Sequence, residues 1–258
     1  MNHDKGHQPQ TAKETTHFGF KTVRKDEKQH LVNQVFSSVA EKYDLMNDLM
    51  SAGVHRLWKR HFAHISGAKA GDWVLDLAGG TGDIARLLIP RVAPGGHVVI
   101  GDISAEMLAV GQRRLIDDGF FGQFSIKQLN AEELPFEDDS FDLVTIAFGL
   151  RNVPDQQKAL GEMQRVLKPG GRVLILEFSR VDSPVLKKVY NFYSFRLLPE
   201  IGRVVANDRD SYQYLVESIR KHPDQDTLKS MLETAGFELC SVYNLSGGIV
   251  AIHSGYKT

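Results

Sequence analysis

The sequence has a single cysteine, no long apolar run and no excess of charge of either sign. Because Cys240 is the only cysteine among 258 residues, an intramolecular disulfide, a Cys-x-x-Cys redox pair and a cysteine-rich zinc site are excluded. No stretch approaches about 18 consecutive apolar residues, and the first 30 residues lack the apolar centre of a signal peptide. We therefore expect a cytoplasmic protein that is soluble or, at most, lies on a membrane surface.

Charge and composition exclude further classes of protein. The chain has 31 lysine and arginine residues and 32 aspartate and glutamate residues, so its net charge of −1 offers no general attraction for nucleic acid. Hydrophobic residues make up 42% of the chain and charged residues 24%, which excludes a fibrous or wholly disordered protein. At this length we expect one large domain, or one domain with an insertion.

The N-terminal part is predicted to be an arm followed by helices. Residues 1–30 are polar and have no sustained apolar period, which is typical of a mobile arm, and their histidines are not expected to form a metal site. From Leu31 the apolar residues recur every four positions, which predicts an amphipathic helix. A second, short helix is expected over 55–65. We interpret residues 31–66 as a helical cap on a single domain, 31–258.

Beyond residue 70, predicted strands alternate with predicted helices. The strands are 73–78, 97–103, 124–131, 141–148 and 171–178, and the helices are 83–92, 105–117 and 155–167. This alternation indicates a parallel sheet with helices on both faces, a doubly wound α/β fold. After an insertion at 183–210, a helix is expected over 227–235, with Asp226 as its N-cap. Two final strands, 237–245 and 248–257, must be antiparallel because their connection is so short, which completes a mostly parallel seven-stranded sheet.

The first predicted strand runs into a glycine-rich turn, Asp76-Leu77-Ala78-Gly79-Gly80-Thr81-Gly82, and then directly into a helix. Glycines let the backbone turn sharply and let a ligand approach closely, which predicts a loop for a nucleotide-type cofactor. Gly80 and Gly82 also satisfy the dinucleotide fingerprint. However, Asp76 would repel a pyrophosphate and attract the ammonium group of a methionine moiety. The loop therefore favours S-adenosylmethionine (SAM) over NAD.

Two later strand ends fit the same cofactor. Asp102 ends the second strand, where its carboxylate can accept hydrogen bonds from ribose hydroxyls of either cofactor. Asn130 and Ala131 end the third strand, where an adenine edge could be hydrogen-bonded. A nicotinamide oxidoreductase remains the alternative enzyme. A non-catalytic SAM- or lipid-binding scaffold is the alternative of a different class.

Residues 70–257 resemble the class I SAM-dependent methyltransferases. Within that class, residues 43–58, 165–179 and 148–153 (Phe-Gly-Leu-Arg-Asn-Val) resemble signature segments of the ubiquinone/menaquinone biosynthesis C-methyltransferases. The resemblance implies a SAM-dependent C-methyltransferase that acts on polyprenylated quinol precursors. It also implies the following cofactor contacts: Thr81 beside Gly80 in the loop, Asp102 on the ribose, and Asn130 with Ala131 at the adenine. Ala147 stands where many members have a serine, so no side-chain contact is expected there.

Methyl transfer to a ring carbon requires an electron-rich ring, so the expected substrate is the reduced quinol and not the quinone. Arg151 is expected to stabilise phenolate charge or to orient water, since a guanidinium is a poor base. Asn152 would orient a quinol oxygen, and Tyr43 would line the pocket and hydrogen-bond the ring. An ion pair for Arg151, packing for Tyr43, and O-methylation remain open alternatives. His55 and Asp44 are expected to fix the local helix-to-turn geometry.

The insertion at 183–210 combines an excess of basic residues with an aromatic and aliphatic stripe. Such a segment suits either an interfacial lid over a lipid-tailed substrate or a helix that covers the sheet. Besides the polyprenylated quinol, the open candidates for partners are a membrane surface, other quinone-biosynthesis enzymes and a second copy of the chain. Nucleic acid is not expected.

Overall fold

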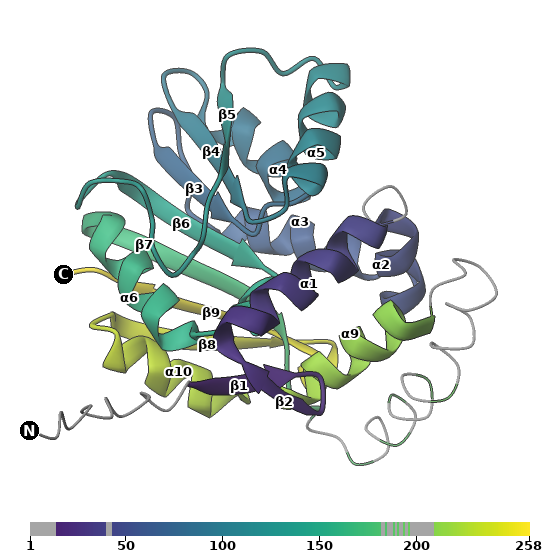
Figure 1. The fold of residues 1–258 in the computed structure, drawn as a ribbon. Coiled ribbons are helices and arrows are strands. Elements are labelled where there is room, and N and C mark those ends of the chain that lie inside the picture. Colours follow the sequence, from purple (N-terminus) through teal and green to yellow (C-terminus); the bar gives the residue numbers. More distant parts are fainter. Residues whose placement is uncertain are drawn as a thin grey trace, which may run out of the picture.

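The structure is a computed structural model that describes residues 14–39, 43–181 and 209–258, together with positions 184, 188, 190, 193 and 196. Its central sheet has the strand order β5-β4-β3-β6-β7-β9-β8 (Figure 1). The strands are β3 (Trp73–Leu77), β4 (His97–Asp102), β5 (Phe124–Gln128), β6 (Phe141–Ala147), β7 (Leu167–Phe178), β8 (Glu238–Leu245) and β9 (Val250–Tyr256). Only the pairings of β9, with β7 and with β8, are antiparallel among these strands. The predicted doubly wound, mostly parallel sheet with an antiparallel C-terminal pair is confirmed.

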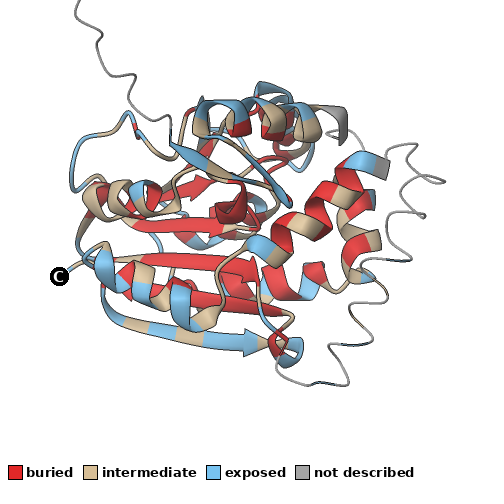
Figure 2. Ribbon diagram, turned by 60° about the horizontal axis from the view of Figure 1, so that its bottom comes forward, coloured by how far each residue is buried: buried red, intermediate tan, exposed pale blue. Residues whose placement is uncertain are grey.

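Helices cover both faces of the sheet. One apolar core joins it to α1 (Lys25–Val39), α3 (His55–Ile65), α4 (Asp83–Val92), α5 (Ala105–Asp117) and α9 (Arg209–Lys221). The opposite core joins it to α6 (Gln156–Val166) and α10 (Gln225–Thr234). The central strands are buried on both faces, whereas the edge strand β8 has no buried residue (Figure 2). Two buried faces explain the continuous apolar runs of these strands in the sequence.

The topology places a crevice at one edge of the sheet. Strand β3 lies between β4 and β6, so the connections after β3 and after β6 run to opposite sides. In doubly wound sheets, ligands bind at the carboxyl ends of the strands beside such a switch point. The glycine-rich turn after β3 and Asp102 at the end of β4 therefore meet at this edge.

The N-terminal part differs from the prediction. The expected mobile arm, 1–30, is wrong from residue 14 onward, because β1 (Thr15–Phe18) and β2 (Lys21–Arg24) form an antiparallel hairpin. Helix α1 then begins at Lys25, six residues before the predicted start. The hairpin docks on distant parts of the chain: the Thr16 hydroxyl donates to the carbonyl of Pro154 over 3.2 Å. Because the strands of the hairpin are short and polar and are held by contacts with distant residues, the sequence shows no apolar period there.

Several smaller expectations also change. A separate helix α2 (Tyr43–Ser51) follows α1, and the N-cap of α10 is Asp224, whose side chain accepts from the N–H of Thr227, and not Asp226. Helix α9 was not predicted. Two short 3₁₀ turns complete the described elements, η2 (Leu150–Asn152) after β6 and η4 (Ser246–Gly248) between the last strands. Apart from single positions and its last two residues, the predicted lid lies outside the described residues.

Candidate active site

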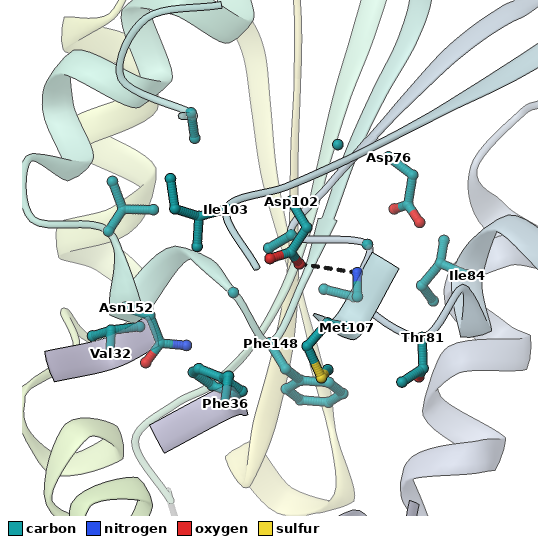
Figure 3. A pocket seen from close by; sticks show the side chains of 18 of the residues that line it. Val32, Phe36, Asp76, Thr81, Ile84, Asp102, Ile103, Met107, Phe148 and Asn152 are labelled. Carbon is teal, nitrogen blue, oxygen red and sulfur yellow. Dashed lines mark hydrogen bonds between the residues drawn. The ribbon is translucent and has the colours of Figure 1, made fainter. Parts of the chain in front are cut away.

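The glycine-rich turn is shaped for close approach. Gly80 and Gly82 have positive φ values of +49° and +80°, which glycine adopts without strain. A Cβ at Gly79 would lie 2.6 Å from a side-chain carbon of Ile100, so no larger residue fits there. The backbone N–H of Gly80 donates to Asp102 Oδ2 over 3.0 Å, which ties the turn to the end of β4 (Figure 3).

Beside this turn lies a cavity of about 990 Å³, part of which is open to solvent. Its walls come from α1, α2, α3, the glycine-rich turn, the ends of β4 and β6, the segment after β5, and η2. Seven of the sequence-predicted site residues line it: Tyr43, Gly80, Thr81, Asp102, Asn130, Ala131 and Asn152. The size lies in the usual range for small-molecule sites. One cavity therefore unites residues that are more than 100 positions apart in the chain.

Asp102 is held as an acceptor at the centre of the cavity. Its Oδ1 accepts from the backbone N–H of Ser104 over 2.9 Å, and its Oδ2 accepts from Gly80. Burial raises the pKa of Asp102 to about 6, although these N–H donors oppose the rise. At neutral pH the carboxylate is ionised and can accept strong, charge-assisted hydrogen bonds.

Asp76 has one carboxylate oxygen that is free to bind a ligand in the cavity. Its side chain lines the cavity and is 1% exposed. The Thr145 hydroxyl donates to Oδ1 over 2.7 Å, whereas Oδ2 has no hydrogen-bond partner of normal geometry among the described residues. Burial raises the pKa of Asp76 to about 7; Thr145 and, more weakly, the Ala85 N–H oppose the rise. A cationic group of a ligand would supply the missing partner and favour the ionised form.

A buried ion pair forms the wall beyond the glycine-rich turn. Lys59 of α3 is 6% exposed, and its Nζ lies 2.6 Å from Asp83 Oδ2 at the start of α4. Arg114 approaches the other Asp83 oxygen at 3.3 Å. Burial opposes ionisation of Asp83, but the charges of Lys59 and Arg114 outweigh it and lower the pKa of Asp83. Both Lys59 and Asp83 line the cavity, and the sequence analysis missed both.

The opposite side of the cavity mixes apolar and polar groups. Val32 and Phe36 of α1 face it beside Asn152 of η2, and Phe148 forms its floor (Figure 3). Tyr43, the first residue of α2, also lines this side, and burial raises the pKa of its hydroxyl. Val32 and Phe36 lie in the helix predicted from Leu31, but nothing in the sequence placed that helix at the cofactor loop.

Arg151 is placed differently from the prediction. It is 6% exposed and is not among the residues that line the cavity. Its Nη1 lies 3.0 Å from Glu177 Oε2 and also donates to the carbonyl of Phe148, while its guanidinium lies 5.5 Å from the ring centre of Phe178. The structure therefore corresponds to the ion-pair alternative. The partner, Glu177, lies on the neighbouring strand β7, which no pattern around Arg151 reveals.

His55 has the local role expected for it. Its Nε2 lies 2.9 Å from Asp48 Oδ1, which links α3 to α2 across the intervening turn. Burial lowers the pKa of His55. The side chain of Asp44 lies outside the described residues.

Neither a metal-binding cluster nor a membrane-spanning helix occurs among the described residues. No group of three or more His, Cys, Asp or Glu side chains there could hold a metal ion. Within the same ranges, no helix is long and apolar enough to cross a membrane.

The fold is that of the SAM-dependent methyltransferases. The structure of a SAM-dependent methyltransferase from Aquifex aeolicus superposes with a TM-score of 0.61 at 19% identity, covering 86% of this chain and 98% of that one. A phosphoethanolamine N-methyltransferase from Haemonchus contortus, solved in complex with SAM, has a TM-score of 0.58 at 18% identity and covers 78% of this chain and 52% of that one. At these identities the likeness concerns the fold alone.

Sequence comparison identifies the family. Residues 21–257 match the model of the ubiE/COQ5 methyltransferase family, and the chain belongs to that family. Among similar proteins are two named ubiquinone/menaquinone biosynthesis C-methyltransferase UbiE. The protein from Vibrio cholerae is 60% identical over 95% of this chain and 94% of its own length. The protein from Stenotrophomonas maltophilia is 61% identical over 94% of this chain and 96% of its own length.

Proposed function

We propose that this protein transfers the methyl group of SAM to a ring carbon of polyprenylated quinol precursors, in the biosynthesis of ubiquinone, menaquinone or both. The observation that carries the proposal is the single cavity in which the SAM-type loop faces an apolar wall with an amide side chain, in a chain of the ubiE/COQ5 family. The apolar wall suits an aromatic ring with a lipid tail, and the amide suits a ring oxygen.

The chain's own residues account for each part of the cofactor. Asp102 would accept from the ribose hydroxyls, and Asn130 with Ala131 would meet the adenine edge. The buried, unpartnered Oδ2 of Asp76 would receive the ammonium group of the methionine moiety. Thr81 and Gly80 would border its chain in the glycine-rich turn. When bound there, SAM supplies an electrophilic methyl group on a sulfonium.

On the substrate side, Val32 and Phe36 would pack against the ring, and Asn152 would donate to a ring oxygen. The reacting carbon forms its new bond as the carbon–sulfur bond breaks, and the displaced ring proton leaves to water or a base. Tyr43, on the same side of the cavity, would hydrogen-bond the ring; burial raises the pKa of its hydroxyl, which is protonated and can donate at neutral pH. Alignment of these groups would supply much of the rate enhancement, because holding the reactants about 3 to 3.5 Å apart makes the methyl transfer effectively unimolecular.

Arg151 acts through its neighbours in this proposal. Its ion pair with Glu177 fixes the backbone of η2, because Glu177 Oε1 also accepts from the N–H of Arg151 over 3.2 Å. The turn that carries Asn152 is thereby held at the cavity edge. Arg151 is accordingly a positioning residue and not the group that touches the quinol.

The test is mass spectrometry of quinones after the purified protein is incubated with SAM and a short-tailed demethylated quinol of each type. We expect a gain of one methyl group on carbon with the reduced substrate and none with the oxidised quinone. Methylation on oxygen would change the reaction assigned here. Absence of product despite SAM binding would favour the scaffold, and binding of NAD without SAM would favour an oxidoreductase.

We also propose that the protein works at the surface of the membrane that holds its substrate, as a lipid-tailed quinol requires. Flotation with vesicles containing anionic lipid and the demethylated quinol should carry the protein upward. Failure to float with any vesicle, with or without quinol, would contradict this. Light scattering at the same concentration would decide between a monomer and a homo-oligomer, and co-purification would test contacts with other quinone-biosynthesis enzymes.

A further inference from the structure

A tyrosine outside the cavity is hydrogen-bonded to an amide inside it. Tyr214 lies on α9, is 4% exposed and does not line the cavity. Its hydroxyl donates to Oδ1 of Asn152 over 3.0 Å. Asn152 is the last residue of η2 and does line the cavity. Tyr214 can therefore act on a ligand only through Asn152.

This hydrogen bond determines which end of the amide faces the ligand. A primary amide has an acceptor oxygen and a donor nitrogen, and the two ends exchange when the group turns over. Because Oδ1 accepts from Tyr214, the nitrogen Nδ2 is the end directed toward the cavity (Figure 3). Burial raises the pKa of the Tyr214 hydroxyl, so it remains a donor throughout the neutral and mildly alkaline range.

Tyr214 is itself fixed by the N-terminal hairpin. Its ring stacks on Phe18 of β1, with ring centres 4.1 Å apart and an angle of 16° between the planes. Thr16 of the same strand donates to the carbonyl of Pro154, two residues beyond Asn152. The hairpin, α9 and η2 therefore contact one another on the side of the Asn152 amide that faces away from the cavity.

We infer that Tyr214 is a positioning residue that locks Asn152 with its N–H groups toward the cavity, so that the site presents a hydrogen-bond donor to a ligand oxygen that gains negative charge. This inference rests on the proposed function for the identity of that oxygen, the hydroxyl of a quinol as it becomes a phenolate. A donor held in place stabilises the negatively charged phenolate more than it stabilises the neutral hydroxyl. The lock thus favours the nucleophilic form of the substrate.

The first test is Tyr214→Phe, which removes the hydroxyl and keeps the ring that stacks on Phe18. We expect kcat at neutral pH to fall about tenfold, less than the 100- to 1000-fold loss typical when an oxyanion donor is removed outright. The alkaline rise of kcat, which follows ionisation of the quinol, should move about one unit to higher pH. The Kd for SAM, measured by calorimetry, should stay within twofold.

The matched control is Tyr212→Phe, which removes a second buried hydroxyl from the same helix and leaves the hydrogen bond from Tyr214 to Asn152 in place. Its kcat and pH profile should match the wild type. A fall in kcat for Tyr214→Phe without the shift of the pH profile would reduce Tyr214 to a packing residue and overturn the inference. Equal losses for the two variants would overturn it as well.

A second measurement separates the inference from the proposed substrate. In the substrate-free protein labelled with ¹⁵N, the side-chain amide signals of Asn152 can be assigned by their loss in Asn152→Asp. Tyr214→Phe should shift and broaden these signals, because the amide can then turn over, whereas Tyr212→Phe should leave them in place. Unchanged Asn152 signals in Tyr214→Phe would refute the lock even where methyl transfer to quinols is confirmed. Shifted signals would support it even where quinols fail as substrates.

Discussion

The two sides of the cavity are built in different ways. On the cofactor side, the glycine-rich turn and Asp102 belong to consecutive strand–loop–helix units, and the hydrogen bond from Gly80 to Asp102 spans 22 positions. On the substrate side, the wall joins α1, η2 and α9: Lys28 donates to the carbonyl of Arg151, 123 positions away, and Thr16 reaches Pro154 across 138. Local sequence shapes the first side and long-range packing shapes the second. Cofactor affinity and substrate turnover should therefore respond to different mutations.

The largest effect is expected for Asp102→Ala. This change removes acceptors for the ribose hydroxyls, and hydrogen bonds to charged groups contribute about 1.5–3 kcal/mol each. The affinity for SAM should fall about 100-fold, measured by calorimetry at pH 8, where Asp102 is ionised because its pKa is about 6. Asp117→Ala, an exposed change at the end of α5, is the control. An unchanged SAM affinity would remove Asp102 from the cofactor site.

Lys28→Met should affect the other side. Lys28 Nζ donates to the carbonyls of Arg151 and Val153 over 3.3 and 3.1 Å, and burial lowers the pKa of this amine to about 8. Loss of both donors from a buried site should lower the free energy of unfolding by about 2 kcal/mol, as urea titration would measure. Binding of SAM should stay within twofold of the wild type.

The control for Lys28→Met is Lys21→Met on the exposed face of the hairpin, which should leave stability unchanged. A parallel loss of SAM affinity and stability in Lys28→Met would show that the two sides are coupled. Cofactor affinity and the packing of the substrate side would then not be independent.

Asp76→Asn should affect stability and SAM binding in different ways, and both effects should depend on pH. The folded-state pKa of Asp76 is about 7, against 3.8 for the unfolded chain, so the folded protein binds more protons between these values. Its contribution to stability therefore falls as pH rises from about 4 to 7. We therefore expect the melting temperature of Asp76→Asn without SAM, taken relative to that of the wild type, to be higher at pH 8 than at pH 4.5.

The same substitution should weaken SAM binding about tenfold at pH 8, because the ammonium group loses its ionised partner. At pH 5.5, where the wild-type carboxyl of Asp76 is largely protonated before binding, the difference in affinity should shrink. Asp117→Asn again serves as the control, with neither effect. A tenfold loss that does not vary with pH would show that the charge of Asp76 is not what binds the cofactor.

The contrast between the sides also explains what could be predicted from sequence. The sheet, the glycine-rich turn and Asp102 follow from patterns within one or two strand–helix units, so they could be predicted. Helix α9 could have been predicted as well, because Tyr212, Leu215, Val216 and Ile219 recur with helical spacing. The hairpin around Phe18 could not, because its short, polar strands acquire their burial only from partners more than 100 positions away. Arg151 shows the same limit: its neighbours in sequence suggest a catalytic cation, while its direction is set by Glu177 on the next strand.

The smallest effect is expected for Phe18→Leu, which tests how far the hairpin reaches into the site. The substitution keeps an apolar side chain but loses the stack on Tyr214, worth about 0.5–1.5 kcal/mol beyond burial. Because Tyr214 would still donate to Asn152 from a looser position, we expect a two- to threefold fall in kcat with SAM affinity unchanged. Phe20→Leu, at the 52% exposed tip of the hairpin, is the control and should match the wild type. If Phe18→Leu instead weakened SAM binding and spared kcat, the hairpin would belong to the cofactor side, and the division of the cavity into a local and a long-range half would have to be redrawn.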